Sequence, residues 1–422
     1  MKKIILMFFI LCAGSLAAQE FNLGAEIRPR FELRNGYSSL MPDHTDPAAF
    51  ISQRTRLNLD FQNDKLKFFT AIQNVNVWGD VGTTSPTSKN GLAFHQAWAE
   101  LFITTKFSLK LGRQEISYDD ERIFGALGWV QQARSHDALV LKYTASENHQ
   151  VHIGLALNAQ NESYTNQAYS INQYQNLQYA RYQGQFDNLR LTLLAMNLGM
   201  PYQRDSLQHY AYNQTFGARL VYTTNKFAVN GSAYVQTGNL AAVNLLAWYA
   251  SANVKYGISD NFTAGAGFEY LSGTDQNTSK NEINSFTPWF GTNHKFNGAM
   301  DYFYVGNHIN SVGLTDIYVF GEITHKDFSA SLRPHIFLSS ATILSPADNT
   351  KTMDPNLGTE IDLTLGYRFN EYVGLQLGYS QMFATESMEA LRSGNADNLN
   401  NWGWLMVTVN PTLFSSSKSK SN

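Results

Sequence analysis

Few side chains in this sequence have a spacing that could form a metal or catalytic site. His149 and His152 stand three residues apart, so in a strand they point to opposite faces and cannot share one ion. The acidic run Asp119-Asp120-Glu121 lacks the alternating ligands of a calcium loop, and a solvated loop is the simpler interpretation. No nucleophile elbow, zinc-protease motif or phosphate-binding loop occurs. We therefore predict no enzyme, metal or cofactor, with a membrane-embedded hydrolase as a minor alternative.

Arginine has a more informative pattern. Arg28, Arg30 and Arg34 share one parity, as do Arg54 and Arg56, so each set would lie on one face of a strand. Guanidinium groups bind carboxylates through two parallel hydrogen bonds, and arginine rings in a pore favour anions. Strand parity assigns to the same face Arg134, Arg181, Arg219, Arg333 and Arg368, and the acids Glu26, Glu32, Asp60, Glu100, Glu269, Glu322, Glu360 and Asp362. The face is therefore either an anion-selective surface or a mutually neutralised ladder that hydrates a wall and fixes strand register.

The elements that carry these residues have the period of β-strands. Apolar residues alternate with polar residues over 21–34 and again over 360–369. Successive side chains of a strand point to opposite faces, so each segment has one apolar and one polar face. The pattern recurs along the chain after residue 18, while capped helical segments are scarce. Segments of about 10 residues with this alternation are typical of a transmembrane barrel, apolar toward lipid and polar toward the lumen.

The connections between the predicted strands alternate between short and long. Short turns are expected at 63–65, 104–106, 146–148, 187–188, 224–226, 259–261, 325–327 and 370–372, and long polar connections at about 35–50, 79–93, 116–133, 159–173, 199–213, 237–246, 339–357 and 381–401. If both termini are periplasmic, residues 272–313 either form one further long outer loop or contain two extra strands, and the first option gives 18 strands. The sequence thus predicts an all-β fold, a transmembrane antiparallel barrel of about 18 strands with short periplasmic turns and long extracellular loops. Such a barrel leaves an aqueous lumen, and the 272–313 loop is long enough to narrow its mouth.

Composition agrees with an exported membrane barrel. The chain has 422 residues, 31 Lys and Arg against 34 Asp and Glu, and only 15% charged residues. Hydrophobic content of 43% excludes a disordered chain, and the net charge of −3 gives no basic surface for nucleic acid. Residues 1–18 have the lysines, apolar run and small residues of a signal peptide. We assign 19–414 to the barrel and 415–422 to a polar C-terminal tail.

Two blocks of the sequence resemble a known family. The first contains Leu111-Gly112-Arg113-Gln114-Glu115, Asp120-Glu121-Arg122-Ile123-Phe124-Gly125, Trp129 and residues 132–138, and the second contains 270–275, 290–298 and Asp301. Both blocks are similar to the alginate export family of outer-membrane barrels. The resemblance implies a monomeric barrel of about 18 strands that passes an anionic uronate polymer through an Arg-rich constriction. The resemblance also implies that Arg113, Arg122, Arg134 and Asp137 line the pore or pack the loops. Arg113 would face inward only if Gly112 bends or bulges the strand.

We therefore predict an outer-membrane channel for anionic solutes, with an acidic polysaccharide such as alginate as a candidate cargo. The alternative is a non-conducting receptor or structural barrel whose loops plug the mouth. Expected partners are outer-membrane lipid and an anionic solute or oligosaccharide, without nucleic acid, and the barrel is expected to be a monomer. The predicted pore-lining residues are Arg28, Arg30, Arg54, Arg56, Arg113, Arg122, Arg134, Asp137, Arg181, Arg219, Arg333 and Arg368.

Overall fold

The structure is a computed structural model that describes residues 19–85, 89–165, 167–171, 174–277 and 281–416. The predicted signal peptide, 1–18, and residues 417–422 of the predicted tail lie outside this part of the chain. Among the described residues, no helix is both long and apolar enough to cross a membrane.

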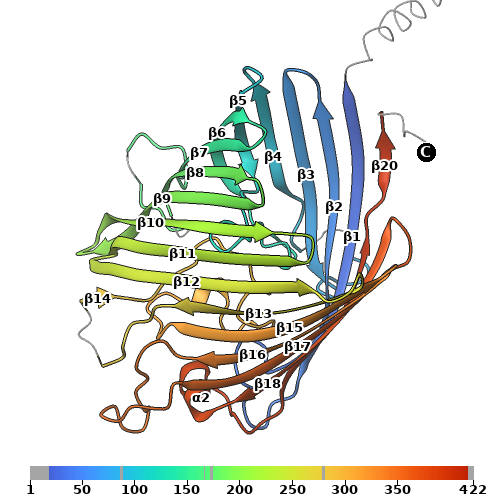
Figure 1. The fold of residues 1–422 in the computed structure, drawn as a ribbon. Coiled ribbons are helices and arrows are strands. Elements are labelled where there is room, and N and C mark those ends of the chain that lie inside the picture. The colour runs from blue at the N-terminus through green and yellow to red at the C-terminus, as the bar shows by residue number, and fades with distance from the viewer. Residues whose placement is uncertain (1–18, 86–88, 166, 172–173, 278–280, 417–422) are drawn as a thin grey trace, which may run out of the picture.

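The chain folds into a closed antiparallel barrel (Figure 1). Twenty strands belong to its sheet, but β14 pairs over two residues only and β20 continues the last strand, so eighteen strands make the wall, as predicted. β1 pairs with β2 on one side and with β19 and β20 on the other, and this seam closes the barrel. The bounds are β1 (Glu20–Asn35), β2 (Ala48–Gln62), β3 (Leu66–Val77), β4 (Ala93–Phe102), β5 (Phe107–Gln114), β6 (His136–Ser146), β7 (His149–Leu157), β8 (Asn176–Phe186), β9 (Leu189–Arg204), β10 (Leu207–Thr223), β11 (Phe227–Leu240), β12 (Val243–Gly257), β13 (Phe262–Leu271), β14 (Glu282–Ile283), β15 (Leu314–His325), β16 (Phe328–Leu338), β17 (Asn356–Arg368), β18 (Val373–Ala384), β19 (Asn400–Val409) and β20 (Thr412–Ser415).

The predicted alternation sets the two faces of the wall. On β1, Ile27, Phe31 and Leu33 are among the exposed large hydrophobic side chains, while Arg28 and Glu32 between them are buried inside the barrel. Outward apolar residues also pair across neighbouring strands, as Leu111 does with Leu139. Closure gives every strand two neighbours, so the backbone polar groups of the wall are paired without water. The outer surface can therefore contact lipid.

The eight predicted short turns all join neighbouring strands at one end of the barrel. Two predicted long connections, 199–213 and 237–246, are wrong. β9 and β10 continue to a two-residue turn at Asp205 and Ser206, which both have positive φ, and β11 and β12 meet at a turn that includes Ala241. Residues with positive φ are typical of such tight hairpins. Near these turns the alternation of apolar and polar residues is lost, in the polar pair Gln203 and Arg204 at one turn and in the apolar run 240–243 at the other, which removed the strand signal.

Two loops fold into the barrel instead of extending away from it. Residues 115–135 and 272–313 bury Phe124, Phe286 and Tyr302 against inward side chains of the wall such as Leu271 and Phe337. The 272–313 loop contains β14 and a short 3-10 helix, η2 (Val305–Asn307), and the last loop contains α2 (Glu386–Arg392). The lumen is therefore not simply aqueous at the loop end, because a packed core occupies part of it.

Candidate functional site

The predicted arginines of β1 and β2 do lie together on the inner wall. Arg28 pairs with Arg54 across the two strands, and Glu26 pairs with Arg56. Five guanidinium groups, those of Arg28, Arg30, Arg34, Arg54 and Arg56, stand on this part of the wall with the carboxylates of Glu26 and Glu32 between them, and the loop carboxylates of Glu115 and Asp301 lie near Arg56 and Arg34. The local charge is therefore positive.

Arg28 and Arg30 hold the tip of the 115–135 loop. Arg28 Nη1 donates to the Gly128 carbonyl at 2.8 Å, and its Nε and Nη2 donate to the side-chain oxygen of Gln131 at 3.2 and 3.0 Å. Arg30 Nη1 donates to the Trp129 carbonyl at 2.7 Å, and its guanidinium lies 4.0 Å from the centre of the Trp129 ring. The loop meets these cations with neutral oxygens, so it immobilises the charges without cancelling them.

Arg54 and Arg56 keep unused hydrogen-bond donors. Arg54 forms an ion pair with Glu26 at 2.6 Å, and Arg56 Nε donates to Gln73 at 2.8 Å. Nη1 of Arg54 and Nη2 of Arg56 are buried and have no hydrogen-bond partner among the described residues. A buried donor without a partner is costly, and an anionic group that reached these nitrogens would relieve that cost.

The start of the 115–135 loop is fixed to the other side of the barrel. Asp119 accepts from Arg181 at 2.7 Å and from the Thr192 hydroxyl at 2.9 Å, and Asp120 lies 2.5 Å from Arg219. Arg181 and Arg219 are therefore inward, as predicted, but each is paired with a loop carboxylate. The acidic run binds the wall cations and is not simply solvated.

The two inward loops are also locked to each other. Gly125 N–H donates to the Phe290 carbonyl at 2.8 Å, and Thr292 N–H donates to the Glu121 carbonyl at 3.0 Å. Arg134 donates to the carbonyls of Phe290 and Gly291. Burial lowers the pKa of Arg134 to about 10. Arg134 therefore packs loop against loop from a position before β6, rather than lining a strand face.

Arg122 extends this contact to the wall. It is buried and lies 2.9 Å from the carboxylate of Glu269 on β13, and it donates to the Asn297 side chain at 2.8 Å. Asn297 donates in turn to Glu269 and to Asp316. The loop-packing role that the resemblance offered for Arg122 agrees with this geometry.

An acidic group of wall residues anchors the 272–313 loop. Glu360 on β17 accepts from the backbone N–H groups of Ala299 and Met300 at 2.6 and 2.8 Å. Asp316 on β15 pairs with His335 on β16 at 2.8 Å. Further along the wall, Gln236 exchanges two hydrogen bonds with the backbone of Thr287. The acids of β13, β15 and β17 thus face loop groups, while the arginines of β1 and β2 stand on a separate part of the wall.

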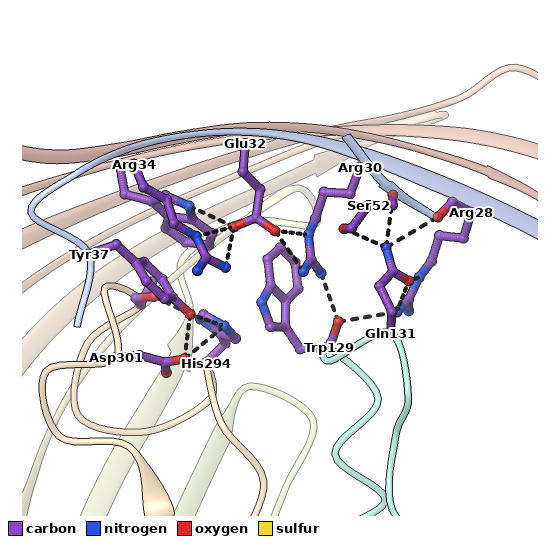
Figure 2. A network of polar contacts seen from close by, with 12 residues as sticks. Arg28, Arg30, Glu32, Arg34, Tyr37, Ser52, Trp129, Gln131, His294 and Asp301 are labelled. Carbon is purple, nitrogen blue, oxygen red and sulfur yellow. Dashed lines mark hydrogen bonds and ion pairs between the residues drawn. The ribbon is translucent and has the colours of Figure 1, made fainter. Parts of the chain in front are cut away.

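The loops meet β1 in one polar network (Figure 2). The Tyr37 hydroxyl donates to Asp301, and the His294 ring nitrogen Nε2 lies 3.1 Å from that hydroxyl and 3.2 Å from the Asp301 carboxylate. His294 Nδ1 lies 2.7 Å from the Ala299 carbonyl, so this nitrogen must carry a proton. Burial lowers the pKa of His294 well below its ordinary value and raises the pKa of Asp301 to about 6. Two acceptors therefore share one hydroxyl proton when Asp301 is ionised.

Beside this network a cavity of about 230 Å³ opens between β1–β3 and the 115–135 loop. Arg30 and Arg34 line it, together with the rings of Tyr37, Phe50 and Trp129. Both guanidinium groups bind Glu32, which also accepts from the indole of Trp402 on β19. Arg34 is the more exposed cation and lies over the Tyr37 ring at 4.1 Å. The cavity thus joins one net positive charge to aromatic walls.

Two predicted pore residues lie on the outside of the barrel, which corrects the prediction. Arg113 on β5 pairs with Asp137 on β6 at 2.9 Å, and both share their face with the exposed Leu111 and Leu139. Gly112 has a φ of +114°, but the strand remains paired and the alternation continues through the buried Gln114. The bend that would turn Arg113 inward therefore does not occur.

The last two predicted pore residues, Arg333 and Arg368, face inward nearer the short-turn end of the barrel. Arg333 on β16 lies 3.6 Å from Glu322, over the rings of Tyr318 and Phe320. Arg368 stands at the turn end of β17, exposed and paired with Asp327. Neither contacts the inward loops in any hydrogen bond or ion pair of the described residues, although Arg333 stands opposite Asp362, which accepts from the Ala299 N–H of the 272–313 loop at 3.2 Å.

Several residues of the site were missed in the sequence. Tyr37, Trp129, Gln131, His294 and Asn297 make the loop contacts, although Trp129 and the segment 290–298 belong to the blocks that carry the family resemblance. That resemblance was the only available signal, because their partners are distant along the chain. In the described residues, no cluster of three or more His, Asp, Glu or Cys side chains is arranged to hold a metal ion.

A closed eighteen-stranded barrel with an apolar outer face and a charged lumen narrowed by loops defines an outer-membrane β-barrel channel protein. The outer membrane is accordingly its location. The chain belongs to the alginate export family, whose model matches residues 19–401. This confirms the resemblance of the two sequence blocks. Comparison with curated protein sequences gives no significant match.

Solved structures similar to this chain are outer-membrane proteins of the same architecture. OpdO of Pseudomonas aeruginosa superposes with a TM-score of 0.64 at 13% identity, over 93% of this chain and 98% of its own. OccAB4 of Acinetobacter baumannii has a TM-score of 0.62 at 12% identity, over 94% and 98%. OpdK of P. aeruginosa, solved with vanillate, has a TM-score of 0.60 at 10% identity, over 92% and 98%. At these identities the likeness supports the fold alone.

Proposed function

We propose that the barrel is a passive channel for anionic solutes, with acidic oligosaccharides such as alginate fragments as the first candidates. The observation that carries this proposal is the excess of arginine toward the loop end of β1 and β2, where five guanidinium groups stand with the wall carboxylates of Glu26 and Glu32, while Glu20 and Asp60 lie toward the turn end. Loop 115–135 meets Arg28 and Arg30 with carbonyl and amide oxygens, so the positive field of these two residues persists in the lumen. Weak sites of this kind attract an anion and still release it.

The geometry gives the solute two kinds of contact along this wall. Arg34 and the aromatic rings at the 230 Å³ cavity would receive a carboxylate and a sugar or aromatic face near the loop end. Arg54 and Arg56 would add positive charge to the wall further along the strand. A small carboxylate and an oligouronate would both fit this sequence of contacts, and OpdK, a similar fold, was solved with the carboxylate vanillate.

Single-channel conductance of the refolded protein in a planar bilayer tests the proposal. A salt gradient reports ion preference, and added oligouronate or vanillate reports binding as a concentration-dependent block. An anion-preferring conductance that oligouronate blocks is expected. Conductance without anion preference would contradict the proposed role of the arginines and leave a general porin.

A second candidate is a non-conducting receptor whose loops fill the mouth. It is favoured by the anchoring of the 115–135 loop on both sides of the barrel, through Arg28 on β1 and Arg181 on β8. Absence of conductance in the same bilayer experiment, with correctly folded protein, would support this candidate and contradict the channel.

A further inference from the structure

The outer face of the wall carries one pair of charged side chains. In the described strands β1–β13 and β15–β20, every other Asp, Glu, Lys and Arg occupies an inward position of the alternation. Arg113 and Asp137 stand opposite each other on β5 and β6, on the lipid-facing side. The channel function proposed above does not involve these two residues.

The backbone fixes Arg113 in this outward position. Gly112 has a φ of +114°, and a Cβ there would approach the Ala97 carbonyl oxygen to 2.4 Å. The next residue, Gln114, is buried and donates to the carbonyls of Gly112 and Ala138. Only glycine fits at 112, and Gln114 holds the inward side, so Arg113 is directed outward.

Arg113 is also held ready to receive an anion. Its Nε donates to the Phe94 carbonyl at 3.1 Å and its Nη1 donates to Asp137 at 2.9 Å. Nη2 makes no hydrogen bond to the described residues, and the side chain remains 44% exposed. Because exposed ion pairs add little stability, the pair by itself gives no structural reason for two charges on this face.

The surroundings indicate the depth of the pair in the membrane. β5 ends at Gln114 and β6 begins at His136, so the pair stands at the loop end of both strands. Below it on the same face are the exposed side chains of Leu111, Leu139 and Leu155. Arginine on the lipid face is costly at the midplane of the bilayer and tolerated near its surface. The pair therefore lies where outer-leaflet headgroups meet the acyl region.

We propose that Arg113 binds the phosphate of a phosphoglycolipid in the outer leaflet. The guanidinium fork suits a phosphate, and the leucines beneath it suit the acyl chains of the same molecule. Asp137 is the partner of Arg113 within the protein, and its carboxylate makes no contact with the phosphate. This role is independent of what passes through the lumen.

The test compares lipid retention by variants of the full-length barrel. Wild type is reconstituted in phosphatidylethanolamine vesicles that contain a bisphosphorylated diglucosamine lipid, and native mass spectrometry counts the lipid retained. Arg113→Gln should retain about fivefold less, the effect of one basic residue at an anionic membrane surface. Asp137→Asn should retain as much as wild type or more. Arg204→Gln, which removes an exposed cation at the β9–β10 hairpin, is the matched control and should leave retention unchanged.

Each outcome decides the matter. Equal loss in Arg113→Gln and Asp137→Asn would mean that the ion pair acts only in the protein, and would overturn the proposal. Unchanged retention in Arg113→Gln would do the same. Wild type can also be tested without any variant, using the dephosphorylated lipid, which should be retained as weakly as the phosphorylated lipid is by Arg113→Gln. Equal retention of both lipids by wild type would contradict a phosphate site.

Discussion

The Arg122 guanidinium and the Glu269 carboxylate, 147 positions apart in the chain, lie 2.9 Å from each other, and both side chains are almost completely buried. Arg122 belongs to the loop that crosses the lumen, and Glu269 belongs to the barrel wall at β13. Asn297 bridges them from the second inward loop. One ion pair thus joins the wall and both loops, and the narrowed part of the lumen depends on it.

Replacing one partner of this pair should release the loops while the barrel remains closed. We expect Arg122→Gln to weaken loop docking by about 3–5 kcal/mol, because Glu269 would be left buried without its cation. Single-channel recordings should then show larger and more variable conductance. A double variant, Arg122→Met with Glu269→Leu, is the control, since apolar replacement of a whole buried pair is close to neutral. If Arg122→Gln has the wild-type conductance, the pair does not hold the constriction.

The arginines of β1 and β2 should separate into two functions. Arg54→Gln with Arg56→Gln should lower anion preference and keep the size of the conductance, because these residues do not contact the loop tip. Arg28→Gln with Arg30→Gln should mainly increase the conductance, since the contacts to Gly128, Trp129 and Gln131 are lost. Reversal potential and conductance measured on both double variants check this. Identical phenotypes would refute the division.

The Tyr37, His294 and Asp301 network should respond to pH. The pKa of Asp301 is raised from an ordinary value of 3.8 to about 6. The stability that comes from its protonated form is therefore complete below pH 3.8 and is lost as the pH rises through about 6. Wild type should therefore hold the 272–313 loop less firmly at pH 7 than at pH 5. Asp301→Asn should remove this pH dependence, because the amide N–H can donate to His294 at every pH in this range. Protease cleavage of the loop across this range is the measurement.

A matched control exists for the Asp301 experiment. Asp348→Asn changes an exposed carboxylate in another loop and should follow the wild-type profile. If Asp301→Asn also follows the wild-type pH profile of protease cleavage, another group is responsible for the pH dependence.

Gly298 should be intolerant of any side chain. It has a φ of +82°, and a Cβ would lie 2.7 Å from both carboxylate oxygens of Glu360, whose Oε1 anchors the loop. Gly298→Ala should therefore weaken the anchor by more than the roughly 1 kcal/mol expected from its backbone conformation alone. Gly79→Ala is the control, since Gly79 has a φ of +86° and no neighbour within 4 Å. Thermal unfolding of the two variants should differ, and equal destabilisation would remove the steric argument.

The sequence by itself determined the wall of this barrel. Alternation over segments such as 21–34 predicted the strands and their lipid-facing side, because the two faces of a strand are defined by neighbouring residues. The eight short turns were also predicted, because each is a run of two or three residues between two alternating segments. The connections at 199–213 and 237–246 were misjudged because the alternation of apolar and polar residues is lost near both turns.

The tertiary structure decided which charges are available to a solute. Arg28 meets Gln131 across 103 positions of the chain, and Trp129 meets Trp402 and Trp404 from the opposite side of the closing seam. Parity can place a side chain inside the barrel, but it cannot show whether a loop covers it. Arg113 shows the complementary case. The family resemblance suggested that this residue lines the pore, but the strand geometry directs its side chain toward lipid. Contacts of this kind arise only when the barrel closes and its loops fold inward.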